Sequence, residues 1–386
     1  MRVLHVFRTY YPDTDGGIER AVDHLSAATS SLGVRNHVFA LSPEPVRKPQ
    51  RLGRAVVHQC RRHLELASCS ISLEWPSVFR RLVQRADIVH YHFPWPFADL
   101  LHLGLARDTP SLVTYHSDIV RQRRLARLYR PLMRRFLQSM DAIVATSPQY
   151  VRTSSELQAV ERARLRVIPL GLDETRYPAV ANSKLAEWRA RLGEGFFLFV
   201  GVLRYYKGLP VLLDALRGRS HRVVIVGSGP MEEALRRQAQ RLGLADRVTF
   251  TSQLPDEDKL ALLHLCRALV FPSHQRSEAF GVSLIEAAMM GRPLITTEIG
   301  TGTSFVNHDG RTGLVVPPGD PAALASAMDR LASDPALAET FGAAARARFE
   351  ACLTHTHYGS AYADLYRELL GGPLSRHEPT PGLPVG

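Results

Sequence analysis

The sequence predicts an α/β protein with two doubly wound, Rossmann-like domains, each built on a mostly parallel sheet. The chain has 386 residues, which is too long for one ordinary hydrophobic core and suits two domains of roughly 180 residues. Short apolar runs alternate with stretches of helical periodicity, a pattern typical of parallel strands joined by crossover helices. The same alternation starts again after residues 178–183.

The first half supplies six short apolar runs that we expect to form strands buried on both faces. They are residues 2–7, 36–41, 87–92, 111–116, 142–146 and 165–168. A helical pattern at residues 18–32 follows the first of them. We place the first domain at residues 1–177.

The second half repeats this arrangement, and we place its domain at residues 178–353. The expected strands are residues 196–201, 222–227, 248–250, 268–271, 293–296 and 313–315. Helices are expected at 322–332, 336–348 and 358–370, and the Gly- and Pro-rich tail 372–386 is expected to be disordered. Ligands of such sheets bind at the carboxyl ends of the strands, so we expect the two sheets to face each other across one cleft.

Composition favours a globular cytoplasmic protein. Hydrophobic residues make up 45% and charged residues 22% of the chain, and no apolar run has the length of a membrane-spanning helix. The first residues lack the pattern of a signal peptide. The four cysteines show neither metal-ligand spacing nor a disulfide framework, which fits a reducing compartment, and we expect no metal site.

Positive charge is concentrated in the first half. Residues 1–180 carry 26 Lys and Arg against 16 Asp and Glu, while the remaining residues carry 22 against 21. Much of the excess lies at 121–137, where apolar residues recur at helical spacing. This basic, amphipathic pattern predicts a surface for an anionic membrane or acceptor, and a solvated helix is an equally good interpretation. Pro131 either kinks this helix or begins a second one. The basic residues singled out are Arg121, Arg123, Arg124, Arg127 and Arg130.

Two acids flank a glycine at the start of a predicted helix near residue 281. Glu278 follows a strand and is expected in a loop, whereas Glu286 lies one to two turns inside the helix, so the two carboxylates reach different parts of one ligand. The amides of the first helical turn, including that of Val282, form a seat for a phosphate. A loop acid beside a solvated helix acid is the alternative. We interpret the segment as a sugar-nucleotide site.

Other polar residues follow the strands of the same domain. Arg204 and Lys207 come after its first strand, where the planar guanidinium and the ammonium can converge on a diphosphate. Gly227 ends the next strand, and Gln253 and Leu254 follow the third, where their backbone is available to a base edge. Each of these features alone also fits an ordinary surface turn.

The first domain offers two candidates at strand ends. Gly16 and Gly17 precede its first helix and allow the backbone to approach a ligand closely, although a tight turn has the same sequence. His116 closes the strand at 111–116 and begins the polar triplet His116-Ser117-Asp118. A lone histidine is more often structural than catalytic, but a strand's carboxyl end favours a functional role.

Taken together, the chain resembles the retaining glycosyltransferases of family 4, which have the GT-B architecture. The resemblance covers almost the whole length. It rests on the pairs Glu278/Glu286 and Arg204/Lys207, on Gly17 with the glycine before it, and on Gly-Arg-Thr-Gly-Leu-Val-Val-Pro-Pro-Gly-Asp at 310–320. One departure is the tyrosine pair at 205–206, where relatives commonly carry a Pro-Glu-like pair, and this leaves the shape of the loop open.

The resemblance implies a role for each matching residue. Glu286 would bind the nucleotide ribose and Glu278 the hydroxyls of the donor sugar. Arg204 and Lys207 would neutralise the leaving diphosphate without a metal ion or any other cofactor. The backbone at Gly17 would lie against the donor phosphate or the acceptor, and His116 would contact the sugar. It also implies that helix 354–371 crosses back to pack on the first domain.

The substrate class follows from a second similarity. Residues 298–307 are similar to a segment of bacterial transferases that build lipopolysaccharide chains from GDP-mannose or GDP-rhamnose. A GDP-linked donor and a lipid-linked saccharide acceptor at the cytoplasmic face of the plasma membrane are therefore expected. Two alternatives stay open: a sugar-nucleotide epimerase of the same fold, and a nucleic-acid-binding protein, suggested by a pI near 9.8. No regular interleaving of aromatic and basic residues supports the second, so we expect no nucleic-acid partner.

Overall fold

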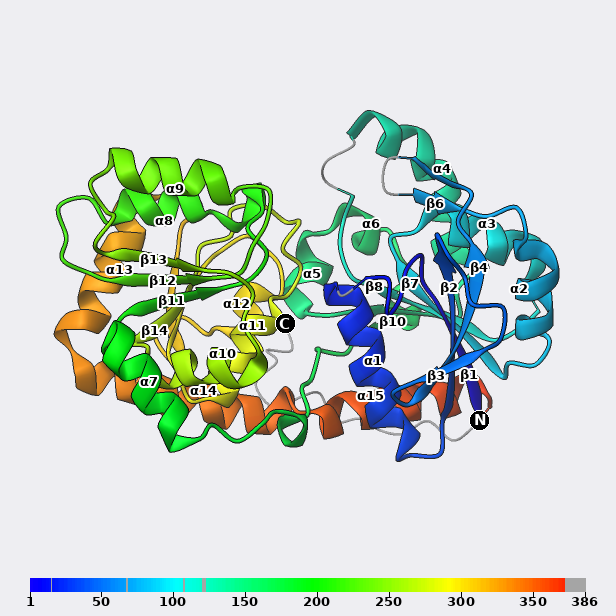
Figure 1. Cartoon of the computed structure of the whole chain (residues 1–386). Helices are drawn as coiled ribbons and strands as arrows, with labels where there is room; N and C mark the ends of the chain where they lie inside the picture. The colour runs from blue at the N-terminus through cyan, green and yellow to red at the C-terminus, as the bar shows by residue number, and fades with distance from the viewer. Residues whose placement is uncertain (15, 67–68, 107, 120–122, 372–386) are drawn as a thin grey trace. The chain divides into compact units, whose positions relative to one another are not determined.

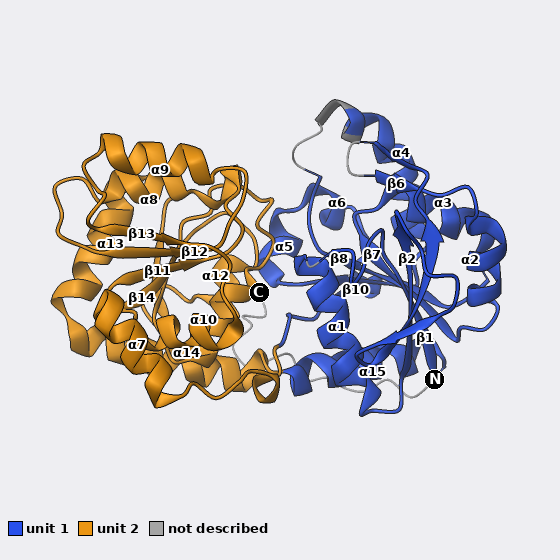
Figure 2. Ribbon diagram, in the orientation of Figure 1, with its two compact units in different colours: residues 1–171, 355–386 blue, residues 172–354 orange. Residues whose placement is uncertain are grey.

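A computed structural model describes residues 1–14, 16–66, 69–106, 108–119 and 123–371. It divides the chain into two compact units (Figures 1 and 2). Unit 1 comprises Met1–Gly171 and His355–Gly386, and unit 2 comprises Leu172–Thr354. The first boundary lies six residues before the expected one at 177–178. The tail 372–386 lies outside the described residues, so the prediction of disorder there stays a prediction.

Unit 1 is built on an eight-stranded sheet with the order β10-β9-β8-β7-β1-β2-β4-β3. All neighbours are parallel except β3 and β4, and β5 and β6 form a separate antiparallel pair. The strands are β1 (Arg2–Val6), β2 (Arg35–Ser42), β3 (Gln50–Leu52), β4 (Ala55–Arg61), β5 (Leu64–Leu66), β6 (Cys69–Ile71), β7 (Ile88–Phe93), β8 (Ser111–Tyr115), β9 (Ala142–Ala145) and β10 (Leu165–Val167). All six strands predicted in this half are present, and β3 to β6 were not predicted.

The helices of unit 1 connect these strands. They are α1 (Gly17–Ser30), α2 (Trp75–Val83), α3 (Pro96–Leu105), α4 (Arg123–Ser139), α5 (Pro148–Thr153), α6 (Ser155–Gln158) and the C-terminal α15 (His355–Leu369), with a 3₁₀ turn at Arg162–Arg164. α15 packs against α1 beneath the sheet (Figure 1). The C-terminal helix therefore returns to the first unit, as predicted. Its Tyr362 and Tyr366 are fully buried.

Unit 2 is built on a six-stranded, wholly parallel sheet with the order β13-β12-β11-β14-β15-β16. The strands are β11 (Phe197–Val200), β12 (Val223–Val226), β13 (Val248–Thr251), β14 (Ala268–Phe271), β15 (Leu294–Thr297) and β16 (Gly313–Val316). Each predicted strand of this half is present within about one residue. The apolar runs form strands here because helices on both faces bury them.

The helices of unit 2 begin at recognisable signals. They are α7 (Asn182–Leu192), α8 (Leu209–Ala215), α9 (Glu232–Arg241), α10 (Asp256–Leu265), α11 (Val282–Met289), α12 (Thr303–Val306), α13 (Pro321–Ser333) and α14 (Pro335–Cys352), with 3₁₀ turns at Glu174–Arg176 and Tyr205–Lys207. Asp320 and Asp334 cap α13 and α14. The Asp320 carboxylate accepts from two backbone amides of the first turn and that of Asp334 from one, and a proline takes the first helical position of each helix.

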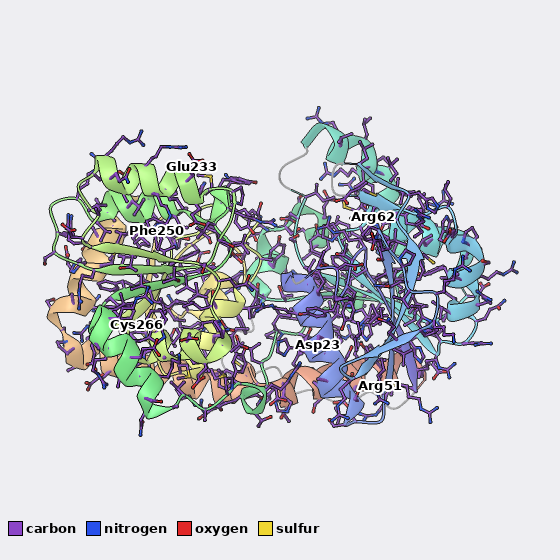
Figure 3. The ribbon with its side chains drawn as sticks, viewed as in Figure 1. Asp23, Arg51, Arg62, Glu233, Phe250 and Cys266 are labelled. Atoms are coloured by element: carbon purple, nitrogen blue, oxygen red, sulfur yellow. The ribbon has the colours of Figure 1, made fainter. Side chains whose placement is uncertain are left out.

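All four cysteines are free, which agrees with the absence of a disulfide framework in the sequence. Cys266, labelled in Figure 3, is buried directly after α10, and burial raises the pKa of its thiol to about 12. Within the described residues, no helix is both long and apolar enough to cross a membrane.

Candidate active site

The chain order of unit 2 reverses between two neighbouring strands, β11 and β14. From β11 the chain continues through β12 and β13 on one side, and then returns to place β14 on the other side of β11. The carboxyl ends of strands at such a switch point flank the crevice in which α/β proteins bind ligands. The loops that follow β11 and β14 are tied together here, because His274 N–H donates to Tyr206 O at 2.9 Å.

The structure brings Lys207 and Glu278 together at this switch point. The Lys207 ammonium donates to a Glu278 carboxylate oxygen, and only 12% and 10% of the two side chains are exposed. The Lys207 nitrogen also lies 4.5 Å from the centre of the Phe271 ring, where a cation–π contact further stabilises the charge. The two residues come from loops 71 positions apart, so the sheet topology is what pairs them.

Arg204 lies on the same loop but is exposed to solvent. Tyr206 stands between the two cations, and burial together with the nearby Glu278 carboxylate raises its pKa to about 12, against an opposing effect of Arg204. The sequence predicted that Arg204 and Lys207 converge on a diphosphate. Lys207 faces Glu278 in this structure, and Arg204 is the cation that solvent reaches.

Glu286 lies in α11 and is nearly fully buried. Its Oε1 accepts from Lys259 Nζ at 2.6 Å and from the Tyr177 hydroxyl at 3.0 Å. Burial alone would lower the pKa of Lys259, but the carboxylates of Glu286 and Asp256 outweigh that effect and raise it. Glu286 is therefore a fixed acceptor held by a buried cation. Sequence reasoning did not identify Lys259, although a lysine on the apolar face of a helix was a signal for it.

The other residues predicted in unit 2 also follow strands of its sheet. Val282 begins α11 after Gly281, so its amide belongs to the first turn, which has no intrahelical partners. Gly227 follows β12, and its amide donates to Thr251 O at 3.3 Å. Gln253 is exposed and Leu254 half-buried, both directly after β13. All of these residues therefore lie at the carboxyl edge that binds ligands in this class of fold.

In unit 1, Gly17 opens α1 after the loop that follows β1. An added Cβ at Gly17 would meet nothing within 4 Å, so packing within the chain does not require a glycine there. Two threonine hydroxyls hold the nearby Glu19, whose Oε1 accepts from Thr9 Oγ1 and from Thr14 Oγ1, both at 2.7 Å. Glu19 was not predicted as a site residue, and it places a buried carboxylate in the first turn of α1.

His116 directly follows β8 and is buried among other histidines that were not predicted from the sequence. Its Nε2 lies 2.9 Å from Nδ1 of His92, and His92 Nε2 lies 3.1 Å from Nδ1 of His5. His90 sits beside them and contacts the hydroxyls of Tyr366 and Thr114 at 2.8 and 2.7 Å. This cluster could have been predicted, because several of these histidines lie within apolar runs that were expected to form strands buried on both faces.

The basic segment forms one helix, α4, with Pro131 inside it. Arg121 lies outside the described residues, and the side chains of Arg123 and Arg124 are not described either. Arg127 is exposed beside Leu125 and Leu128, which are 53% and 80% exposed. Arg130, predicted to face an anionic surface, donates to Glu156 of α6 at 2.6 Å, and 44% of its side chain is exposed.

Comparison with known proteins decides the family. The model described as Glycosyltransferase Family 4 matches residues 15–176, and the model described as Glycosyl transferases group 1 matches residues 182–348. The chain belongs to glycosyltransferase family 4. Neither the family models nor the relatives below support the epimerase or the nucleic-acid-binding hypothesis.

Two relatives are similar to this glycosyltransferase over nearly its full length. D-rhamnosyltransferase WbpZ of Pseudomonas aeruginosa is 53% identical over 92% of each chain. O-antigen chain mannosyltransferase C of Escherichia coli is 47% identical over 96% of this chain and 99% of its own. Among solved structures, sucrose-phosphate synthase from Thermosynechococcus elongatus is 25% identical with a TM-score of 0.76, covering 96% of this chain and 99% of its own. The glycosyltransferase WaaG is 17% identical with a TM-score of 0.68 over 94% of this chain and 99% of its own. These neighbours confirm the GT-B fold predicted from the sequence.

Proposed function

We propose that this glycosyltransferase transfers mannose or rhamnose from a GDP-linked donor to a lipid-linked saccharide during O-antigen synthesis. The observation that carries the proposal is the identity of 53% and 47% to a D-rhamnosyltransferase and an O-antigen chain mannosyltransferase, each over more than nine-tenths of both chains. Because one relative is a rhamnosyltransferase and the other a mannosyltransferase, the proposal leaves the sugar as either rhamnose or mannose.

The switch point of unit 2 supplies what a departing diphosphate needs. Lys207 keeps two further N–H donors beside the one it gives to Glu278, and the first-turn amides of α11 add the positive end of a helix dipole. Fixed positive groups that face a developing negative charge usually contribute the largest catalytic effect. We assign the leaving diphosphate to this place, with Arg204 closing on it from solvent and no metal ion or other cofactor required.

The reaction proceeds with retention of configuration. The bond between the anomeric carbon and the phosphate oxygen breaks, and the acceptor hydroxyl oxygen bonds to the same face of that carbon. The proton of the hydroxyl passes to the departing phosphate oxygen, so that no separate carboxylate base is needed. Glu278 binds the hydroxyls of the sugar while Lys207 neutralises the phosphate.

A panel of nucleotide sugars tests this proposal. Nucleoside diphosphate release is measured with GDP-mannose, GDP-rhamnose and UDP-glucose, with and without a chelator, and NMR gives the anomeric configuration of the product. We expect GDP to be released from a GDP-sugar at a rate that the chelator does not change. The anomeric configuration of the product should be the same as that of the donor. Lys207→Met should lose at least 100-fold in rate, while Lys184→Met, which removes an ammonium paired with Glu187 and Asp258, should not. Turnover of UDP-glucose alone would contradict the GDP-linked donor. Inversion at the anomeric carbon would contradict retention, and loss of activity with the chelator would contradict a reaction without a metal ion.

The two acids should separate in their effects. Glu278→Ala should abolish transfer while nucleotide binding persists, because its carboxylate faces the sugar rather than the base. Glu286→Ala should instead weaken GDP binding, measured by titration calorimetry, because it removes the acceptor that Lys259 fixes. Equal losses in both assays would contradict this division of roles.

We further propose that α4 touches the anionic inner face of the plasma membrane. The support is an exposed leucine pair beside Arg127 on a basic helix, a combination that inserts at charged interfaces. Leu128→Glu should release the protein from vesicles that contain phosphatidylglycerol in a flotation assay. Leu73→Glu is the matched control, since Leu73 is 75% exposed but lies outside α4. Equal binding by both variants would contradict a membrane role of the helix.

A further inference from the structure

A row of buried imidazoles crosses three strands of unit 1 and ends at His116. Asn36 of β2 contacts His5 of β1, His5 contacts His92 of β7, and His92 contacts His116 after β8. The distances between the contacting nitrogen and oxygen atoms are 3.0, 3.1 and 2.9 Å. None of the four side chains is more than 6% exposed.

The first member of the row has a fixed orientation. The Asn36 amide nitrogen donates to Ser26 O at 3.0 Å, and an amide oxygen cannot take that position against a carbonyl. Asn36 Oδ1 therefore faces His5, and it also accepts from Thr29 Oγ1. An amide oxygen only accepts hydrogen bonds, so His5 Nε2 must carry a hydrogen.

The imidazoles are neutral, because they are buried and, in the part of the chain that the structure describes, they contact one another and Asn36 but no carboxylate. Burial lowers the pKa of His5 to about 4 and that of His116 to about 3, and it holds the pKa of His92 well below its usual range. A neutral imidazole has one N–H and one bare nitrogen. Once His5 carries its hydrogen on Nε2, its Nδ1 is an acceptor, so His92 must donate from Nε2. His92 Nδ1 is then an acceptor in turn, and His116 must donate from Nε2.

We propose that Asn36, His5 and His92 are positioning residues that hold His116 in the Nε2–H tautomer, so that its Nδ1 accepts a hydrogen bond from a sugar hydroxyl of the substrate. Within the described residues, Nδ1 of His116 has no protein partner, and the ring lies at the carboxyl edge of the sheet where ligands bind. A hydroxyl is a donor that the bare nitrogen can accept, whereas the other tautomer would present an N–H. The role in substrate binding rests on the proposed glycosyl transfer, but the tautomer itself does not.

The same cluster also has the spacing of a metal site. Nitrogens of His5, His90 and His92 lie within 4.8 Å of one another. Both ring nitrogens of each of these histidines already contact a protein group, however. A metal ion would have to break the contact between His5 and His92, so the hydrogen-bonded row is the arrangement that the geometry favours.

The experiment reads the tautomers directly in the substrate-free, full-length protein. Two-bond nitrogen–proton NMR spectra of protein labelled at the histidine rings distinguish Nε2–H from Nδ1–H, and single-histidine variants assign the signals. We expect Nε2–H for His5, His92 and His116. Nδ1–H or a mixture at His116, or a metal ion bound at one equivalent, would overturn the proposal whether or not the protein transfers sugar.

A variant pair then links the tautomer to substrate binding. His92→Phe removes the acceptor of His116 but keeps a ring in the stack. It should give a mixed His116 tautomer and a roughly 3- to 10-fold lower kcat/KM, carried by KM.

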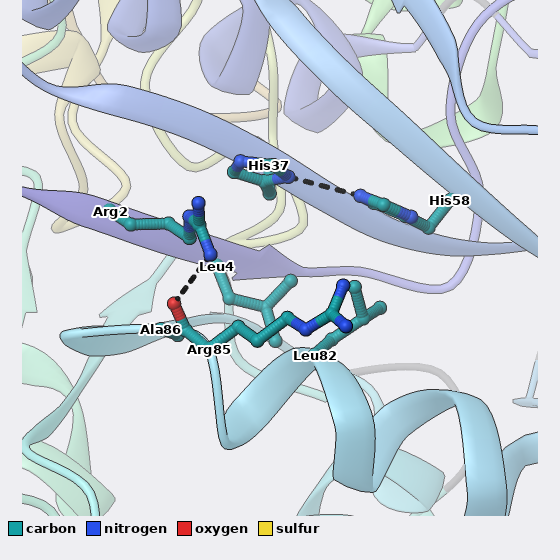
Figure 4. A pocket seen from close by; sticks show the side chains of 7 residues that line it. All are labelled: Arg2, Leu4, His37, His58, Leu82, Arg85 and Ala86. Atoms are coloured by element: carbon teal, nitrogen blue, oxygen red, sulfur yellow. Dashed lines mark hydrogen bonds between the residues drawn. The ribbon is translucent and has the colours of Figure 1, made fainter.

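The control breaks an equivalent contact elsewhere on the same sheet. His37 Nδ1 and His58 Nε2 lie 3.0 Å apart, with ring centroids 5.3 Å apart (Figure 4). The corresponding distances for His92 and His116 are 2.9 Å and 5.2 Å. His58→Phe should change neither the His116 spectrum nor kcat/KM. A pure Nε2–H signal in His92→Phe, or an equal kinetic loss in His58→Phe, would overturn the proposal.

Discussion

Gly208 determines how the loop after β11 fits against the loop after β14, and its replacement by alanine should disconnect them. The residue has a φ of +71°, a left-handed conformation, and follows Lys207 directly. A Cβ there would lie 1.8 Å from Pro272 O, whereas real Cβ contacts are not shorter than 3.0 Å. The loops must therefore separate by at least 1.2 Å, the difference of these two distances. Lys207 lies on the loop after β11 and Glu278 on the loop after β14, so a separation of the two loops would pull this ion pair apart.

The magnitude follows from comparison with Gly218, which has almost the same φ of +68° but open space around its Cβ. Gly218→Ala should cost only the left-handed backbone, about 1–2 kcal/mol of unfolding free energy. Gly208→Ala adds a clash with a backbone atom and should cost about 4 kcal/mol or more. If the loop moves instead, a misplacement of about 1 Å at Lys207 should lower the transfer rate by about 100-fold.

Urea unfolding and GDP-sugar turnover of the two variants check this prediction. Tryptophan fluorescence follows Trp188 in unit 2, which is buried. Equal effects of Gly208→Ala and Gly218→Ala on both stability and rate would refute the reasoning, because the two substitutions differ only in the clash.

Two further predictions concern buried charge and pH. Lys259→Met should cost about 3–5 kcal/mol in urea unfolding, because it leaves the Glu286 carboxylate buried without its cation, and Lys259→Met combined with Glu286→Gln should recover part of that loss. The free energy of unfolding should fall as pH drops below about 6.5, by about 1.4 kcal/mol per pH unit for each buried histidine. Here the folded pKa of His5, about 4, and that of His116, about 3, lie below the unfolded value, so only the unfolded chain takes up protons in that window. A flat stability profile between pH 6.5 and 4.5 would contradict neutral buried rings.

The sequence was sufficient for the fold because the strands of a doubly wound sheet carry their own signal. Runs such as the one that forms β14 are apolar and end at a turn, and every strand of unit 2 was predicted within about one residue. β4 was missed although it has seven residues and belongs to the main sheet. Its sequence, Ala-Val-Val-His-Gln-Cys-Arg, mixes polar residues into the run, because one part of the strand is only half-buried.

The site was less predictable because its contacts depend on how strands pair rather than on local sequence. Motif and spacing placed Lys207 and Glu278 at strand ends, but only the order of β11 and β14 in the sheet shows that they touch. From its motif, Glu286 was predicted only to bind the ligand. Its Oε1 also accepts a hydrogen bond from Lys259, which lies on another helix.

The histidine row shows the same limit most clearly. His5 pairs in register with His90, and His92 pairs with Thr114, so that alternate residues of adjacent strands bring the imidazoles onto one face. A slip of one residue in either register would turn them to the opposite face and break the row. The hydrogen-bond direction at His116 therefore depends on the pairing of four strands and on one amide at Asn36. A single-residue motif cannot carry that information, and a tautomer at the end of β8 can be inferred only from the assembled sheet.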